Sequence, residues 1–446
     1  MAAPPYTEGM LNKFELFQSP EISKQIDSAI VTTYRPLDPL TKDQPIEFNI
    51  TGTEDYFIDG SSLKLRIRGQ FVEAKAGGDV DIKPEGSKTF YPCNNFMHSL
   101  FKQVDCYFND HQMNESAETY SQKAMLEKLL NFDAAYKKHN LLNVLWAKDD
   151  EKQMNAFVTP TLNATSSNKN DGSVIRGKYA ADSKEFEMID QLHIDALNTS
   201  QFIMNNISVR IRLLPHNFKY YTMASADTVN FYFKIKEATL EVVRVKPTNS
   251  MLLTVASQLQ SNPARYAATM GTFKVRKLPA NEIIVHLDDV FLQQIPNAII
   301  LGMINTKAAE GDLTKNPHKF EHNDVASISA FMNGTQIPPL GYNTDFENNV
   351  YLQCYTDLMQ IAGKWNNNKN MGISREDYKN GHTLFGFDLT RGLIINTPFF
   401  KPGRKGTLRI EIRFKKALTE SQNLYIYGMC DHEFFIDNTY TISSTW

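Results

Sequence analysis

The residues whose spacing comes nearest to a catalytic motif are His318, Glu321 and His322, in the order His-x-x-Glu-His. On a helix, this order brings the two histidines to one face, where they can bind zinc. Here the motif follows residues 315–317 in a polar region without helical periodicity. We therefore expect a solvated loop at these positions rather than a metal site.

Two other stretches resemble ligand-binding loops only in part. Residues 168–172 lack the carboxylate spacing and the closing glutamate of a calcium loop, so we expect a turn within an exposed polar loop. Residues 402–406 are basic and flanked by glycine but lack the Walker spacing, so we expect a hairpin turn. The chain has neither a GxSxG elbow nor a GxGxxG fingerprint, and His98, His193 and His286 stand alone in the sequence. We predict no enzyme, no cofactor and no metal site.

The composition bounds the class of protein. A chain of 446 residues is long enough for two or three domains, and 42% apolar with 22% charged residues is typical of a globular protein. A net charge of -3 argues against a strongly basic nucleic-acid binder. The longest apolar run, near residues 298–304, is too short to span a membrane, and residues 1–7 lack the features of a signal peptide. We expect folding in the cytosol or nucleus, with reduced thiols at Cys93, Cys106, Cys354 and Cys430.

Alternation of apolar and polar residues predicts β-strands in most of the chain. Residues 63–68, 208–213 and 409–414 each alternate apolar side chains with mostly basic ones, which is the period of a half-buried strand. Helical periodicity is rare, and its best cases are residues 118–130 and 355–364. The fold class is therefore mostly β. Further strands are predicted at residues 45–50, 104–108, 230–235, 239–245, 282–287, 328–332 and 424–427.

One order of features occurs twice along the chain. Residues 106–113 and 330–337 each read as a strand that runs into an Asn-Asp or Asn-Gly turn, the signal of a tight hairpin. Each is followed by one of the two helical stretches, a long polar loop, an Arg-rich alternating strand and a closing pair of strands. This repetition predicts two tandem jelly-roll β-sandwiches, with few short helices in loops.

The two sandwiches lie between terminal segments without clear periodicity. The predicted parts are an N-terminal arm, a first jelly roll, a linker, a second jelly roll and a C-terminal tail, at residues 1–30, 31–246, 247–264, 265–438 and 439–446. Phe14, Leu16 and Phe17 of the arm have no core of their own to enter, so they are candidates for assembly contacts. Tyr440 and Trp446 of the tail are further candidates.

The stretch at residues 94–110 is specific enough for a resemblance. Its Asn-Asn-x-x-His-Ser-Leu-Phe sequence, which leads into a strand and an Asn turn, resembles a signature of major capsid proteins of the polinton (Maverick) and adintovirus group. Residues 60–68, 342–346 and 385–389 are similar to other stretches of that group, and the resemblance covers about residues 37–435. These motifs are structural and mark no catalytic site.

The resemblance implies a hexon-like, double jelly-roll major capsid protein of an icosahedral double-stranded DNA virus. Three copies of two similar sandwiches would present six comparable blocks, so a homotrimer would form a pseudo-hexagonal capsomer of the shell. The resemblance also implies penton and minor capsid proteins as partners, with no sequence-specific nucleic acid and no membrane span. The expected location is the virion capsid, assembled in the host nucleus or cytoplasm.

Two other interpretations stay open at this point. A carbohydrate-binding or glycoside-cleaving β-sandwich, such as a receptor-binding spike, needs no sequence motif, because the separation of its carboxylates is spatial. A cellular protein descended from an integrated viral element would carry the same motifs. The plain expectation for His98, Leu100, Phe101 and Val104 is the core of one sandwich, and the alternating arginines are expected on a solvated sheet face.

Overall fold

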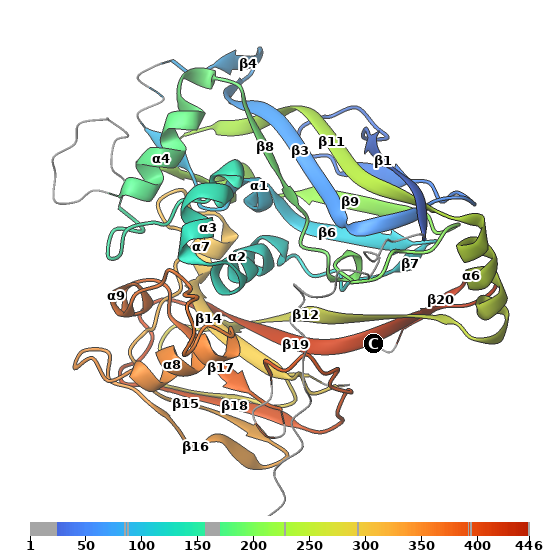
Figure 1. The fold of residues 1–446 in the computed structure, drawn as a ribbon. Helices are drawn as coiled ribbons and strands as arrows, with labels where there is room; N and C mark the ends of the chain where they lie inside the picture. Colours follow the sequence, from blue (N-terminus) through green and yellow to red (C-terminus); the bar gives the residue numbers. More distant parts are fainter. Residues whose placement is uncertain are drawn as a thin grey trace, which may run out of the picture.

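The structure, a computed structural model, describes residues 25–83, 86, 89–156, 170–226, 229–291, 294–390, 392 and 395–444. These residues form two β-sandwiches, one from each half of the chain. Figure 1 shows the second half, in yellow to red, beneath the first half, in blue to green.

The first sandwich has a large sheet and a facing smaller one. The large sheet has the order β1-β11-β3, and both β8 and β4 pair with β3. The facing sheet has the order β2-β9-β6-β7, and β5 pairs with β10 in a separate ribbon. The strands span Ile26–Tyr34 (β1), Ile46–Ile50 (β2), Phe57–Lys75 (β3), Gly78–Asp81 (β4), Phe90–Pro92 (β5), Phe101–Phe108 (β6), His111–Gln112 (β7), Phe186–Gln191 (β8), Val209–Pro215 (β9), Thr222–Ala224 (β10) and Phe231–Pro247 (β11).

The second sandwich is built in the same way. One sheet has the order β12-β19-β14-β17, with β20 paired to β19, and the facing sheet has the order β13-β18-β15-β16. The strands span Ala264–Leu278 (β12), Ile284–Leu287 (β13), Ala298–Asn305 (β14), Val325–Met332 (β15), Thr335–Asn343 (β16), Leu384–Asp388 (β17), Leu408–Phe414 (β18), Gln422–Ile436 (β19) and Ile442–Ser444 (β20).

The two sandwiches share one strand topology. When β1, β2, β3, β6, β7, β8, β9 and β11 are numbered one to eight, one sheet joins strands one, eight, three and six. The facing sheet joins strands two, seven, four and five. Numbering β12 to β19 in the same way gives the same two orders. Eight strands arranged in two facing sheets of this kind form a jelly roll, so the predicted fold class is confirmed.

The features that suggested a repeat occupy equivalent places in the two halves. The hairpins β6–β7 and β15–β16 both turn through residues with positive φ, which is 43° and 68° at Asn109 and Asp110 and 50° and 82° at Asn333 and Gly334. A two-residue type I′ turn requires positive φ at both positions. The Arg-rich alternating strands are β9 and β18, the seventh strand of each sandwich.

The closing pair of strands predicted for each half is one long strand. Two strands are predicted at residues 230–235 and 239–245, but residues 231–245 all belong to the continuous β11. Its register against β3 shifts between Ile235 and Glu237, so a bulge absorbs the break in alternation and the strand continues. The same holds for β19, which runs unbroken beside β12.

The terminal and linking segments hold more regular structure than expected. Strand β1 begins at Ile26, so residues 26–30 of the predicted arm pair with β11. The predicted linker contains helix α6, Asn249–Ser261, of which Leu259 is the buried residue. The predicted tail contains β20, which pairs with β19. Exposed segments such as these show no burial alternation, so their sequences gave no periodic signal.

The helices lie mainly in the connections between strands. The predicted helical stretches are confirmed as α2 and α8. In the described residues, no helix combines the length and apolar character that a membrane span needs. The α-helices are Phe96–Ser99 (α1), Tyr120–Asn131 (α2), Ala134–His139 (α3), Asp171–Ala180 (α4), Phe218–Tyr221 (α5), Asn249–Ser261 (α6), Thr306–Glu310 (α7), Leu352–Ile361 (α8) and Arg375–Lys379 (α9), and the 3-10 helices are Asn140–Val144 (η3), Ala181–Ser183 (η4) and Asp195–Leu197 (η5).

Candidate functional site

The two histidines of the His-x-x-Glu-His segment have different neighbours. His318 is fully buried, and its Nε2 lies 3.0 Å from the Ser99 hydroxyl. His322 stacks on Phe346, with ring centroids 4.2 Å apart. The expectation of a solvated loop is wrong for His318, because the segment enters the boundary between the two sandwiches. Across the described ranges, no group of three or more His, Cys, Asp or Glu side chains could hold a metal ion.

The Ser99–His318 pair resembles a nucleophile and its base but lacks the surroundings that catalysis requires. Both side chains are completely buried, so no substrate reaches them. Burial lowers the pKa of His318 to about 3, which makes it a poor proton acceptor. Burial also raises the pKa of the neighbouring Cys93 thiol to about 12. These three residues therefore serve the packing of the junction.

The other two partial motifs have structural roles as well. Helix α4 begins within the expected loop, and the buried Asn170 caps it by accepting a hydrogen bond from the Ser173 N–H (3.3 Å). Asn170 is the last residue before α4, and residues 168 and 169 lie outside the described chain. Residues 402–406 form an irregular stretch instead of a hairpin turn. There the Arg404 guanidinium donates to the Leu389 carbonyl. The backbone of Arg404 also forms an isolated antiparallel β-bridge with that of Ile295.

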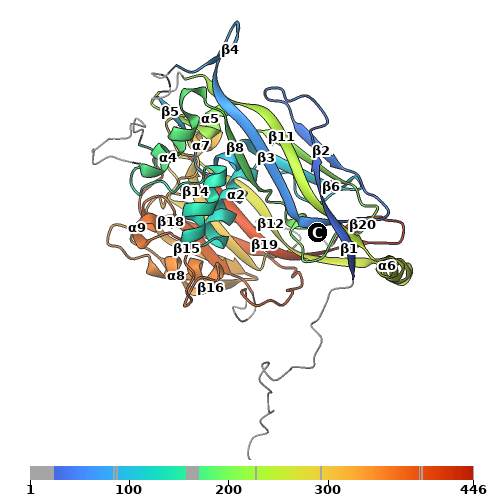
Figure 2. The same cartoon turned by 45° about the horizontal axis from the view of Figure 1, so that its top comes forward.

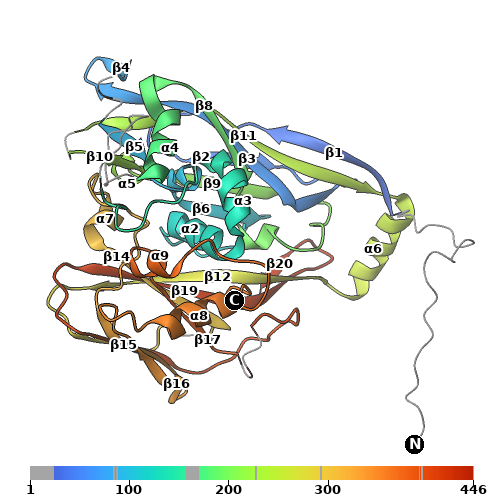
Figure 3. The same cartoon turned by 60° about the vertical axis from the view of Figure 1, so that its left-hand side comes forward.

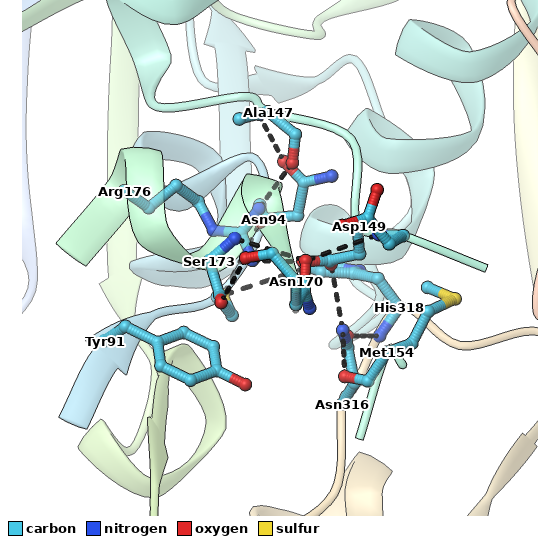
Figure 4. A network of polar contacts seen from close by, with 12 residues as sticks. Tyr91, Asn94, Ala147, Asp149, Met154, Asn170, Ser173, Arg176, Asn316 and His318 are labelled. Atoms are coloured by element: carbon cyan, nitrogen blue, oxygen red, sulfur yellow. Dashed lines mark hydrogen bonds and ion pairs between the residues drawn. The ribbon is translucent and has the colours of Figure 1, made fainter. Parts of the chain in front are cut away.

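A buried polar network joins the loops of the first sandwich to the second (Figure 4). Its centre is the ion pair between Arg176 of α4 and Asp149, with 2.5 Å between Nη2 and Oδ1 and side chains 0% and 1% exposed. Arg176 also donates to the carbonyls of Pro92 (2.9 Å) and Ala147. The guanidinium thus holds three segments of the first half together.

The same network reaches the second half through Asp149. Its carboxylate accepts hydrogen bonds from the amides of Asn170 and Asn316, each at 3.0 Å. The Asn316 side chain in turn accepts from the His318 N–H (2.9 Å), and His318 lies against Ser99 of α1. A charged group buried in this way is tolerated because its hydrogen-bonding capacity is used.

Asn94, His98 and Ser99 of the stretch at residues 94–110 are buried and hydrogen-bonded, and Ser99 is the one among them that contacts the second half, through His318. Asn94 Oδ1 accepts from the N–H groups of Asn95 and Ala147, at 2.8 and 2.9 Å. His98 contacts the Tyr120 hydroxyl through Nδ1 (2.9 Å) and Asp190 through Nε2 (3.1 Å). The apolar residues of the stretch, Leu100, Phe101 and Val104, are at most 4% exposed, so the expectation of core positions is confirmed.

A second polar cluster lies where α2 meets the sheet of the second sandwich. Glu127 contacts the imidazole of His193 and accepts from the hydroxyl of Tyr427, the latter at 3.1 Å. Although burial alone would raise it, the Lys123 ammonium and these hydrogen bonds lower the pKa of Glu127 to about 2. Asp195 pairs with Lys123 at 2.5 Å and accepts from the N–H of Gly271 in β12. Tyr427 and Gly271 belong to the second half, so this cluster also joins the sandwiches.

Lys137 of α3 makes a third link between the halves. Its buried ammonium donates to the carbonyl of Leu129 in the first half and to that of Met371 in the second. The ammonium also lies 5.7 Å from the centre of the Trp146 ring. Burial, followed by the charges of Lys364 and Lys148, lowers the pKa of Lys137 to about 7.

Aromatic contacts extend the junction along β12 and β19, which run beneath the first sandwich (Figure 1). Phe434 of β19 stacks on Tyr266 of β12 and touches the edge of Phe108 in the first sandwich, at centroid distances of 4.7 and 5.8 Å. The Tyr266 hydroxyl donates to the Phe202 carbonyl (3.1 Å) and accepts from the Met204 N–H (3.1 Å).

A groove of about 600 Å³ borders α2, the sheet that contains β12, β14 and β19, and residues 395–401. It is lined by three carboxylates, those of Glu127, Asp195 and Asp431. Glycoside cleavage requires one carboxylic acid that can donate a proton, hence one with a raised pKa, and a second free carboxylate. Burial raises the pKa of Asp195, but Asp195 and Glu127 both pair with Lys123, and Asp431 accepts a hydrogen bond from the N–H of Lys401. Each carboxylate of the groove is therefore held by another group of the fold.

The sequence-predicted assembly residues are only partly within the described chain. Phe14, Leu16, Phe17 and Trp446 lie outside the described residues. Tyr440 is half-buried, and its hydroxyl accepts from Asn206 Nδ2 (3.0 Å) while its carbonyl accepts from Asn109 Nδ2 (3.3 Å). Through these two hydrogen bonds, Tyr440 links the end of the second half to the first sandwich of the same chain.

Further exposed apolar side chains, which the sequence did not single out, lie in both halves of the chain. Ile26, Ile30 and Val31 lie on β1, and Leu253 lies on the neighbouring helix α6. A second set consists of Leu340, Trp365, Phe399 and Phe400 in the second half. Such side chains mark candidate contact surfaces. Their exposure depends on tertiary structure, so the sequence pattern could not separate them from core residues.

Comparison with known proteins adds the architecture of whole chains. No protein-family model matches. An uncharacterized protein of Caenorhabditis elegans is 22% identical over 360 residues, covering 79% of this chain and 81% of that protein. A chain of the Sputnik virophage structure has a TM-score of 0.65 at 11% identity and covers 100% of this chain and 94% of its own.

Two further solved structures agree over nearly their full length. The mavirus major capsid protein has a TM-score of 0.54 at 10% identity, with 99% of this chain and 96% of its own covered. The capsid of the virus PBCV-1 gives 0.56 at 9% identity, with 96% and 99% covered. The chain has the double jelly-roll fold of these capsid proteins. The match spans both halves, so the placement of the two sandwiches relative to each other is also similar to that in these structures.

Proposed function

We propose that this chain is the major capsid protein of an icosahedral double-stranded DNA virus. The observation that carries the proposal is the fold match over 100% of this chain and 94% of a Sputnik virophage chain. Three buried networks hold the two sandwiches in one arrangement, which suits a building block of fixed shape. A structural role also agrees with the buried, inert Ser99–His318 pair.

The repeated topology supports a homotrimer. Each chain supplies two sandwiches with the same strand order, so three chains supply six comparable blocks. A closed ring of three chains then has a nearly hexagonal outline, which fills a lattice without large gaps. The proposed capsomer is therefore a trimer with pseudo-sixfold shape.

The resemblance of residues 94–110 supports membership in the polinton and adintovirus group. The related protein in Caenorhabditis elegans fits this proposal, since an element that enters animal genomes would leave such relatives. The same observation favours a second candidate, a cellular protein descended from an integrated viral element. The two candidates share the fold and differ in whether virions form.

The proposed partners are other copies of the chain, followed by penton and minor capsid proteins. Residues 1–24, with Phe14, Leu16 and Phe17, and the tail residue Trp446 are proposed to contact them. We propose no sequence-specific nucleic-acid contact. The proposed location is the virion capsid, with assembly in the host nucleus or cytoplasm.

The native mass of the purified full-length chain tests the proposal. Size-exclusion chromatography with light scattering should give three times the chain mass of 50.8 kDa over a wide range of concentrations. A glycan array serves as the second arm, because the carbohydrate-binding alternative predicts retention and the capsid proposal predicts none. A monomer at all concentrations that binds glycans would contradict the proposed function.

A further inference from the structure

A cavity of about 290 Å³ opens between the two sheets of the first sandwich. Ile46 of β2 and Phe101 of β6 line it from one sheet, and Phe233 and Ile235 of β11 line it from the other. Ile46, Phe101 and Phe233 are at most 7% exposed, so the cavity reaches the apolar core. Figure 2 shows β2 and β11, the strands on its two sides. Tyr221 of α5 also lines the cavity, and Figure 3 shows α5 at the end of the molecule opposite α6.

The floor of the cavity is an aromatic cluster of the core. Phe233 packs against Phe96 and Phe186, with ring centroids 5.2 Å apart in both pairs, and it contacts Phe71 at 5.5 Å. These rings belong to the core or pack against it, so an apolar surface is already in place for a ligand. An apolar cavity of about 150 Å³ can hold one benzene ring, so about 290 Å³ has room for a body of about two rings.

Backbone hydrogen bonds close the equivalent end of the second sandwich. There the loop between β12 and β13, residues 279–283, meets the connection between β18 and β19. The N–H of Asn281 donates to the carbonyl of Leu418 (2.8 Å), and the N–H of Leu418 donates to that of Glu282 (3.0 Å). Leu418 is 3% exposed and belongs to the core. The two connections and one leucine thus cover the core at this end.

The corresponding loop of the first sandwich, residues 35–45, has different contacts. The N–H of Leu37 donates to the carbonyl of Glu47 in β2 (2.8 Å), so the loop is held to the strand that follows it. Leu40 lines the cavity, and the Lys42 ammonium lies 4.2 Å from the centre of the Tyr232 ring. The loop therefore borders the mouth of the cavity without filling it. Because the same fold is closed in the second sandwich, the cavity follows from this loop and not from the jelly roll itself.

The charges at the mouth of the cavity are balanced. Lys234 pairs with Asp79 at 2.8 Å, and Lys42 and Asp43 are adjacent in the loop. Two ammonium groups and two carboxylates therefore border the cavity, so it has no net charge that would attract an ion. A charged ligand would also lose its hydration on entering the apolar walls. The cavity thus favours an uncharged ligand.

Polar partners for such a ligand are present as well. Thr41, Gln44 and His216 line the cavity. Burial lowers the pKa of His216 to about 4, so its imidazole is neutral at pH 7. Among the described residues, the His216 Nδ1 has no hydrogen-bond partner. A neutral imidazole has one nitrogen that donates and one that accepts, and a hydroxyl group can pair with either.

We propose that this cavity is a binding site for a small, uncharged, mainly apolar molecule that carries one hydroxyl group. The apolar body, of about two rings, lies against Ile46, Phe101 and Phe233. The hydroxyl group is bound by the polar side chains at residues 41, 44 and 216. The site goes beyond the proposed function, because it lies within one sandwich of one chain and exists whether or not the chains assemble.

A pair of probes with the same two rings tests the ligand class. Isothermal titration calorimetry of the full-length protein at pH 7 should show one saturable site per chain for 2-naphthol. The affinity for 2-naphthoate should be lower by about tenfold or more, because its carboxylate would lose hydration beside Asp43 and Asp79. Equal or tighter binding of 2-naphthoate, or no saturable binding of 2-naphthol, would overturn the proposed site and leave the proposed capsid function standing.

Variants that fill the cavity locate the bound probe. Leu40→Trp enlarges a side chain of the loop at the mouth, and it should weaken 2-naphthol binding by about tenfold or more, because the apolar space is occupied. The matched control is Leu253→Trp, at a side chain of α6 that is 72% exposed, and it should bind as the unchanged protein does. Ile235→Phe fills the cavity from β11 and serves as a second variant if the thermal midpoint shows that Leu40→Trp does not fold. Full affinity in a folded filling variant, or an equal loss in the control, would contradict binding in this cavity.

Discussion

At the residue scale, the junction between the sandwiches depends on polar groups withdrawn from water. The Arg176–Asp149 pair is the clearest case, with both side chains at most 1% exposed. A buried pair gains little over an apolar replacement of both partners, but removal of one partner leaves an uncompensated charge. Removal of one partner should therefore destabilise the fold by more than the intact pair stabilises it.

Arg176→Ala tests this view of the buried pair. The free energy of unfolding, measured by urea denaturation, should fall by about 3–5 kcal/mol because Asp149 stays buried without its counter-ion. The control is Arg66→Ala, which breaks an ion pair with Glu187 whose side chains are 43% and 47% exposed. Exposed pairs contribute little, so the control should unfold almost as the unchanged protein does. Equal losses in both variants would argue against a special role for the junction.

Buried histidines should make the fold sensitive to mild acid. Burial lowers the pKa of His98, His216 and His382 to about 4 and that of His318 to about 3. Between pH 6.5 and these values the unfolded chain binds protons that the folded chain does not, so stability falls as the pH falls. The carboxylates with lowered pKa values, such as Glu127, contribute to the loss of stability only below about pH 4.5.

The variant His382→Gln isolates one of these groups. His382 is 1% exposed, and by pH 5 its contribution to the loss should be about 2 kcal/mol. The difference in unfolding free energy between pH 7 and pH 5 should therefore be smaller in the variant by that amount. An unchanged difference would mean that His382 titrates normally.

At the element scale, the sequence predicts the strands whose side chains alternate between buried and exposed. It does not reveal the strands that lack this alternation. Strands β9 and β18 bury one face and expose the other, so their period of two was visible. Strand β14, Ala298–Asn305, is buried on both faces and was seen only as an apolar run. Strand β1 is exposed on both faces from Ile26 to Val31, so it gave no period either. A period of two appears in the sequence only when the two faces of a strand differ in burial.

The candidate site was less predictable than the strands. Ser99 and His318 meet across 219 positions of the sequence, and Asn316 and Asp149 across 167. Only the fold brings such residues together, and a single sequence carries no trace of the pairing. Within the stretch at residues 94–110, the side chains of Asn94, His98 and Ser99 are buried and take part in hydrogen bonds.

The hairpin of the second sandwich offers a test of local backbone conformation. Gly334 has φ 82°, and a Cβ built there would meet no atom within 4 Å. Gly334→Val should therefore lower the unfolding free energy by about 1–2 kcal/mol through conformational strain alone. Gly77 also has open space but no positive φ, so Gly77→Val should be nearly neutral. Thermal scans of the two variants side by side decide the matter, and equal midpoints would contradict it.

At the scale of the whole molecule, the sandwiches should behave as one unit despite their separate cores. Helix α6 is the covalent link and is mostly exposed, whereas the Asp149, Glu127 and Lys137 clusters all cross the boundary. A protease site inserted between Ser257 and Gln258 can be cut without touching these contacts. The two fragments should elute together at the native mass under native conditions. Separation of the fragments would show that the linker, and not the junction, holds the halves together.

The outline of the purified assembly tests the central claim most directly. Electron cryo-microscopy of the full-length protein should show particles of three chains, with six blocks of similar size around a true threefold axis. Particles with only one pair of blocks at every concentration, or assemblies without threefold symmetry, would contradict the account of the chain as a capsid subunit.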